Sequence, residues 1–152
     1  MATPRIPKTD QAKQAQLDNL LEHVADQLGD ITPLVMDRFY RDYPEARVLF
    51  VDLACGYPER LEASMVESAL YCVMTWFERP AEIHIILAEA VPHHELLGVP
   101  VAQFIGLQVA VIDTIVSALP SDGTHDRALL VEIGAALTEV ISAYAEGDRE
   151  AC

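Results

Sequence analysis

The 152-residue sequence predicts a single all-α domain. Apolar residues recur at intervals of three and four over several long segments, as on one face of a helix. Proline and glycine separate these segments, and no stretch alternates with period two between turn signals. Apolar residues make up 51% of the chain and charged residues 22%, which is typical of a globular protein. We expect one domain over residues 1–152, with an ordered core at about 9–146 and short tails.

Three long helices and one short helical turn are predicted in the first half of the chain. The first helix carries an apolar stripe that begins at Leu17, and Gly29 ends it. Pro33 suits the first turn of the second helix, which should end before Pro44 because the residue preceding a proline is disfavoured in helix. The expected elements are helices at about 9–29, 31–42 and 58–78, a short turn of helix at 44–50 and a loop at 51–58.

Three further helices are predicted in the second half. Pro92 should bend or restart the first of them, which places a histidine pair in a short final turn ending at Gly98. The next helix is apolar nearly all round and is expected to be central. Gln103, Gln108 and Asp113 interrupt it, which favours a buried helix over a membrane span. The expected helices cover about 81–91, 100–119 and 125–145, followed by a frayed charged tail after Gly147, giving about six main helices plus short turns.

The charge and the cysteines limit the classes of partner and compartment. With 24 acidic and 10 basic residues, the net charge of −14 repels phosphate backbones and anionic lipid surfaces. We therefore expect neither a nucleic-acid partner nor a membrane partner. Cys55, Cys72 and Cys152 are widely spaced and form no metal-binding pattern. Free thiols, and a start without a signal-like apolar run, favour a cytoplasmic protein.

The adjacent pair His93 and His94 is the first candidate for chemistry. Imidazole at a helix end beside an apolar segment suits an iron or zinc ligand, a titrating switch, or an ordinary solvated side chain. The residue types alone leave these alternatives open. The other histidines, His23, His84 and His125, have no partner at ligand spacing and are expected to face solvent.

Two segments carry a resemblance to a known family. The segment 39–50, FYRDYPEARVLF, resembles the second-helix-to-loop segment of single-domain bacterial globins and of flavohaemoglobin globin domains. The pattern His94-x-x-x-Gly98-Val99 is similar to the proximal-histidine motif of the same family. Helix order, loop positions and length agree from about residue 9 to 146. The resemblance implies a globin-like fold that holds haem (iron protoporphyrin IX).

The resemblance assigns the proximal side of such a haem site. It implies that His94 is the iron ligand and that Phe50 stacks on the face of the haem. Val99 and Phe104 would line the proximal side, while His93 would face solvent. Phe104 replaces a tyrosine that flavohaemoglobin-like domains use to polarise the proximal histidine, which implies weaker support for peroxidase-like or dioxygenase chemistry.

On the distal side the sequence departs from the family. Met36 occupies the position of the family's tyrosine, and Leu61 that of its glutamine, with Met65 one turn further along. A pocket lined by these three side chains offers a bound gas no hydrogen-bond donor. Arg60 is expected either to pair with a haem propionate or to pair with the glutamates on each side of it.

Three functions follow from these assignments. The favoured one is a haem globin that binds O2, NO or CO as a carrier, sink or sensor. The alternative is a haem-free globin-fold domain that binds another apolar ligand or a partner protein. A nitric-oxide dioxygenase, which would need an external reductase, is disfavoured by Met36, Leu61 and Phe104 together. The apolar face of 99–119 leaves a homodimer open.

Overall fold

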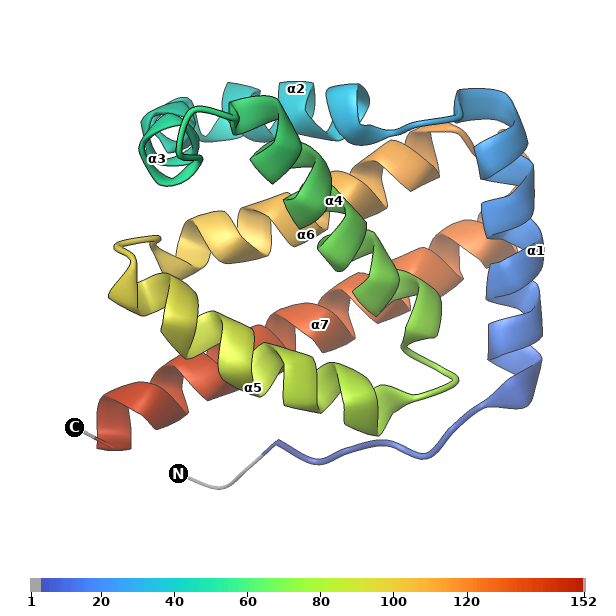
Figure 1. Cartoon of the computed structure of the whole chain (residues 1–152). Coiled ribbons are helices and arrows are strands. Elements are labelled where there is room, and N and C mark those ends of the chain that lie inside the picture. The colour runs from blue at the N-terminus through green and yellow to red at the C-terminus, as the bar shows by residue number, and fades with distance from the viewer. Residues whose placement is uncertain (1–3, 152) are drawn as a thin grey trace.

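The computed structural model describes residues 4–151, with side chains described for residues 4–145, and these residues form an all-α fold (Figure 1). Seven helices occur in this part of the chain, and no strand. The prediction of an all-α protein is confirmed, and the arrangement is consistent with a globin-like fold. The helices are α1 (Gln11–Leu28), α2 (Thr32–Asp42), α3 (Ala46–Leu53), α4 (Pro58–Thr75), α5 (Pro80–Leu96), α6 (Val101–Ser117) and α7 (Thr124–Ala151).

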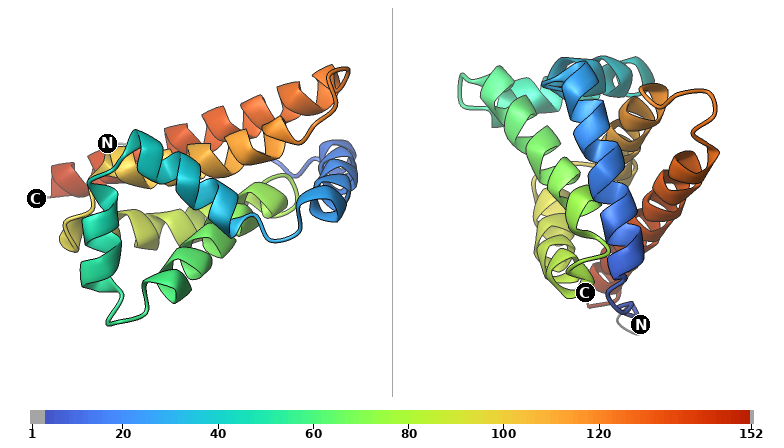
Figure 2. Two further views of the ribbon diagram at one scale, coloured as in Figure 1. Left: turned by 90° about the horizontal axis from the view of Figure 1, so that it is seen from above. Right: turned by 90° about the vertical axis from the view of Figure 1, so that its right-hand side faces the viewer.

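The helices form two groups that cross one another. α6 and α7 lie side by side, and α5 packs against α7 (Figure 2). α2 and α4 cross α6 on its other side, while α1 contacts α4 and α7. Short α3 links α2 to α4 and packs against α4. This arrangement places α4 and α5 on two sides of a space that α6 closes.

Local sequence signals set most of the helix ends. The side chain of Asp10 accepts a hydrogen bond from the backbone N–H of Lys13 at 3.0 Å, which caps α1 at its start. Gly29, with a φ of 63°, follows its last residue. Prolines occupy the first turns of α2, α4 and α5, where their missing N–H costs no helical hydrogen bond.

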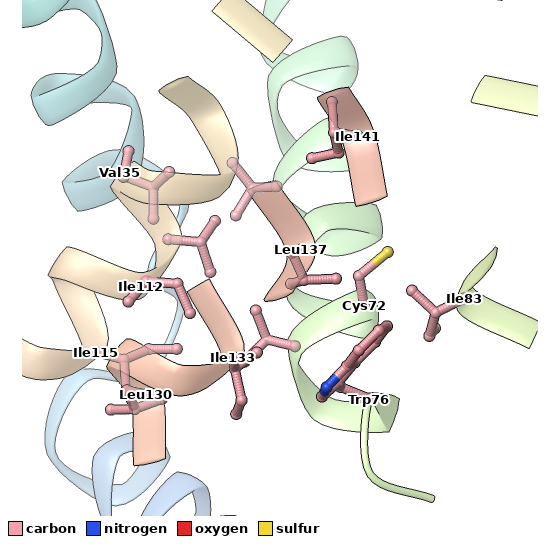
Figure 3. Close-up of a cluster of buried hydrophobic side chains, with 14 of the residues drawn as sticks. Val35, Cys72, Trp76, Ile83, Ile112, Ile115, Leu130, Ile133, Leu137 and Ile141 are labelled. Atoms are coloured by element: carbon pink, nitrogen blue, oxygen red, sulfur yellow. The ribbon is translucent and has the colours of Figure 1, made fainter. Parts of the chain in front are cut away.

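The core is built around α7. Figure 3 shows Ile133, Leu137 and Ile141 between side chains of α6 on one side and side chains of α4 and α5 on the other. All three are completely buried. The apolar stripes predicted for residues 9–29 and 125–145 form the buried faces of α1 and α7. Burying a leucine or isoleucine stabilises the fold by about 1.5–3 kcal/mol, so this stripe is a large part of what holds the helices together.

The crossing of α2 and α6 depends on the absence of a side chain. Tyr43 ends α2, and its ring lies directly against Gly106 of α6. A methyl group at residue 106 would overlap this ring. Tyr43 also stacks at a tilt on Phe39, with ring centroids 5.6 Å apart. The glycine therefore allows an aromatic side chain to fill the space between two helix backbones.

Three boundaries differ from those predicted. Pro92 lies inside α5, which is continuous to Leu96, because the final turn of α5 keeps its hydrogen bonds on the C-terminal side of the proline. The short turn predicted at 44–50 is an eight-residue helix, so the expected loop begins later. α7 extends to Ala151 in place of ending at 145, and the side chains of the charged tail lie outside the described residues.

Among the described residues, one stretch, Thr124–Ala145, is long and apolar enough to cross a membrane by length and composition. Core helices pass the same test. In this structure the stretch packs against α5 and α6, and its apolar residues include the buried stripe of Figure 3. The packing of α7 in the core accounts for its composition.

Candidate functional site

Two cavities of similar volume lie between the helices, and their chemistry differs. One, of about 500 Å3, lies among α1, α2, α4 and α6, and its lining contains neither imidazole nor thiol among the described residues. The other, of about 470 Å3, lies among α2 to α6 and collects two imidazoles, a thiol, a hydroxyl and two carboxamides; we name it the histidine cavity. Its lining is Phe39, Leu49, Phe50, Leu53, Leu61, Met65, Ser68, Ala69, Cys72, Ile86, Leu87, Ala90, His93, His94, Leu97, Val99, Gln103, Phe104, Leu107 and Gln108.

The histidine cavity is apolar with a few polar groups. None of the described residues that line it is a lysine, arginine, aspartate or glutamate. Its volume lies within the range of about 300–1,000 Å3 that small-molecule sites occupy, and such sites combine an apolar wall with a few placed polar groups. The exposed residues of its lining are His93 of α5, Leu97 directly after that helix, Leu53 of α3 and Ser68 of α4, so these three helices border its opening. The chain therefore provides a binding cavity of ordinary size and composition.

The His94 ring is held in one orientation. Its Nδ1 lies 2.7 Å from the carbonyl oxygen of Ala90, which can only accept, so Nδ1 carries the proton. The edge-to-face contact with Phe104, with centroids 4.9 Å apart, fixes the plane of the ring. In this tautomer Nε2 carries the lone pair. Some side-chain nitrogen and oxygen atoms of the described residues are sealed inside the protein without a hydrogen-bond partner, and Nε2 of His94 is not one of them. His94 thus presents a metal-binding nitrogen to the cavity.

The turn after α5 supports His94 through the backbone. The N–H of Val99 donates to the carbonyl of His94 at 2.9 Å, and the N–H of Gly98 donates to that of Glu95 at 3.0 Å. These are the two bonds of a Schellman motif, which requires the positive φ of 86° that Gly98 adopts. The predicted stop at Gly98 is confirmed, and it brings Val99 into the cavity wall.

Phe50 reaches the cavity from α3 as part of an aromatic cluster. Its ring meets Tyr40 at 5.9 Å and Phe39 at 6.1 Å, both edge to face. The Tyr40 hydroxyl donates to Glu62 at 2.6 Å, and the Arg47 guanidinium lies 4.1 Å from the centre of its ring. Burial and Glu62 together raise the pKa of Tyr40, so this hydroxyl stays protonated. The cluster fixes α3 against α2 and α4 with Phe50 facing inward.

Polar groups enter the cavity from α4 and α6. Gln103 and Gln108 are almost completely buried, at 6% and 4% exposure. The amide of Gln108 donates to the carbonyl of Ala69 at 3.1 Å, which joins α6 to α4. Cys72 lies one turn further along α4, and burial raises the pKa of its thiol to about 11, with a smaller contribution from Glu82. The thiol is therefore neutral at physiological pH.

The structure brings together most of the site residues named from the sequence. Met36 and Arg60, however, do not line the histidine cavity. Met36 is 4% exposed and belongs to the core, because its position on α2 turns it away from the cavity. Arg60 is exposed, and its guanidinium lies 4.7 Å from the centre of the Tyr57 ring. The six that line one cavity are Phe50, Leu61, Met65, His94, Val99 and Phe104.

The prediction that His84 faces solvent is wrong. It is 1% exposed, stacked on Trp76 with centroids 5.8 Å apart, and its Nδ1 lies 3.1 Å from the Tyr144 hydroxyl. Its Nε2 is sealed and has no partner among the described residues. Desolvation lowers the pKa of His84. The stripe of α5 that faces α7 includes residue 84, which places this imidazole in the core.

The reading of the sequence missed several residues that form the cavity wall. The polar ones among them are Gln108, Gln103, Cys72 and Ser68. The two glutamines interrupt an otherwise apolar helix, and with Phe104 and Leu107 they share one helical face. That placement of polar groups on a buried face was the available signal. Cys72 carried none, since a single cysteine on an apolar stripe is commonly a core residue.

No protein-family model matches this chain, and no significant similarity is found to curated proteins or to solved structures.

Proposed function

We propose that this chain is a haem-binding globin that binds a diatomic gas. The observation that carries the proposal is His94, which faces an apolar cavity with Nδ1 bonded to a backbone carbonyl and Nε2 accessible. A carbonyl partner on Nδ1 is the usual arrangement of a metal-ligating histidine, because it fixes the tautomer and the ring. The resemblance of two segments to bacterial globins supports the same reading.

The lining residues fit a haem in two respects. A single imidazole cannot complete the coordination of a metal ion, so a metal at His94 must bring ligands of its own, as a porphyrin does. The wall around His94 is apolar, with Phe50, Leu61 and Val99 among its members, which suits the body of a porphyrin. When bound, haem would supply an iron that can bind a diatomic gas, and His94 would hold that iron.

The chain's own residues supply orientation and exclusion of water. The Ala90 carbonyl fixes the tautomer of His94 and holds its ring, while the contact with Phe104 prevents rotation. Leu61 and Met65 from α4 form the wall that faces α5, and apolar side chains there keep water from the interior. These roles suit reversible binding of a gas better than an oxidative reaction, because the described lining contains no carboxylate and burial keeps the Cys72 thiol a weak acid.

The test is a titration of the purified, haem-free protein with hemin, followed by the absorption spectrum. We expect uptake of one equivalent with a sharp Soret band. His94→Ala should lose this band while keeping its helical circular dichroism. The matched control is His93→Ala, since His93 is the exposed neighbour on the same cavity rim, and it should retain haem. Absence of stoichiometric uptake by the unaltered protein, or equal loss in both variants, would contradict the proposal.

A second candidate is a haem-free domain that binds an apolar ligand in the same cavity. It is favoured by the absence of lysine and arginine from the described lining, because haem propionates usually meet a cation. The two nearby arginines, Arg47 and Arg60, both lie on tyrosine rings. Binding of a fluorescent fatty acid that hemin does not displace, in a protein that retains no haem, would establish this second function.

A further inference from the structure

Gln108 is the more deeply buried of the two carboxamides in the cavity wall. It is 4% exposed, on the central helix α6, and lies one turn after Phe104, the residue in contact with His94. Its amide nitrogen donates one hydrogen bond, to the carbonyl of Ala69 on α4. A carboxamide has two N–H donors and one acceptor oxygen, so this bond uses only part of its capacity.

The carboxamide oxygen of Gln108 is not sealed inside the protein. It has no hydrogen-bond partner within the described part of the chain, yet it is not among the sealed, unpartnered atoms there. The second N–H of the amide likewise has no partner among the described residues. Because the residue lines the histidine cavity, the free surface of the amide lies on the cavity side. A ligand that enters the cavity can take the place of water at this group.

We propose that Gln108 is the hydrogen-bonding residue for the ligand in the histidine cavity. The bond to Ala69 holds the carboxamide in place, so that its second N–H is ready to donate to the ligand. With a gas as the ligand, which rests on the function proposed above, this donor favours a molecule whose outer atom becomes negative on binding, such as dioxygen, over carbon monoxide. The donor that the α2 and α4 positions lack would then come from α6.

The experiment compares the haem-loaded unaltered protein with Gln108→Met, in which the side chain has similar length and no amide. We expect oxygen to dissociate about two- to tenfold faster from the variant, the effect of one hydrogen bond, while carbon monoxide dissociation changes by less than about twofold. The C–O stretching frequency of the carbon monoxide complex should rise, since a nearby donor lowers it. This infrared readout does not depend on turnover.

The matched control is Thr114→Val. Thr114 is also buried on α6 and donates to a backbone carbonyl, that of Ala110 at 2.7 Å, but it does not line the cavity. This variant should leave both the oxygen rate and the C–O frequency unchanged. Gln108→Leu serves as the second variant if Gln108→Met fails to fold.

The outcomes separate this inference from the proposed function. Haem uptake with the same C–O frequency and oxygen rate in Gln108→Met and in the unaltered protein would overturn the role of Gln108 alone. Failure of the unaltered protein to retain haem would overturn both. If neither variant folds, the unaltered protein decides: a C–O band at the position found in purely apolar pockets would overturn the inference, and a band below it would support the inference.

Discussion

Two histidines ten residues apart on α5, His84 and His94, make similar contacts at one ring nitrogen and differ in the surroundings of the other. Each has its Nδ1 near an oxygen atom, the Tyr144 hydroxyl at 3.1 Å and the Ala90 carbonyl at 2.7 Å respectively. Each also meets an aromatic ring. The Nε2 of His84 is sealed in the core, whereas that of His94 is accessible from a cavity.

The difference shows that burial alone does not identify a functional histidine. Both side chains are bonded at one ring nitrogen, and only the surroundings of the other nitrogen separate a packing role from a binding role. His84 joins α5 to the end of α4 and to α7 through Trp76 and Tyr144, so its removal should act on stability. His94 faces a space that a ligand can fill, so its removal should act on binding.

The largest effect should come from His84→Ala. Removing a completely buried ring and leaving a cavity should lower the free energy of unfolding by about 3 kcal/mol. His94→Ala should lower it by less than about 1 kcal/mol in the haem-free protein, because a half-buried side chain with one hydrogen bond is lost. Urea unfolding of both haem-free variants measures the comparison. Equal losses would mean that the two positions have the same structural role.

A smaller effect is expected from Tyr144→Phe. This change removes the hydroxyl beside Nδ1 of His84 and leaves that nitrogen without a partner, which should cost about 1–2 kcal/mol. Tyr57→Phe is the control, because the Tyr57 side chain is exposed and its ring remains available to Arg60; it should change stability by less than about 0.5 kcal/mol. If Tyr144→Phe is as stable as the control, the contact with His84 contributes nothing.

The smallest effect concerns pH. Burial lowers the pKa of His84 below its ordinary value of 6.5, so below pH 6.5 the unfolded chain binds a proton that the folded chain does not. The free energy of unfolding should therefore fall as the pH drops from 6.5, with a contribution from His84 below about 1 kcal/mol at pH 6 and none above about pH 7.5. Urea unfolding of the unaltered protein and of His84→Phe between pH 5 and 8 isolates it. Parallel profiles for the two proteins would contradict the assignment.

The helices were largely predictable from sequence because local chemistry determines them. Asp10, the prolines at helix starts, and Gly98 mark ends where the backbone itself requires those residue types. Pro92 did not end its helix, and the turn that follows it keeps its own backbone hydrogen bonds. Whether a proline bends or ends a helix depends on the following turn, which a residue-by-residue reading does not weigh.

The cavity was less predictable because it depends on how helices cross. A family resemblance named His94 and Phe50, and the structure places both in one cavity wall. Met36 was expected in the cavity because the resemblance assigns it the position of the family's tyrosine, which assumes one rotation of α2 about its axis. A shift of that helix by one residue turns a side chain by about 100°. Gln108 was not predicted as a site residue, because its hydrogen bond to Ala69 depends on the contact between α6 and α4.

The close approach of Tyr43 to Gly106 makes two residues far apart in the chain dependent on each other. Any residue larger than glycine at position 106 requires a smaller side chain at position 43, or a wider separation of α2 from α6. Related chains with the same fold should therefore show joint substitution at this pair. Such a paired constraint, together with the spacing from Phe50 to His94, offers a way to find distant homologues that overall sequence identity does not reveal.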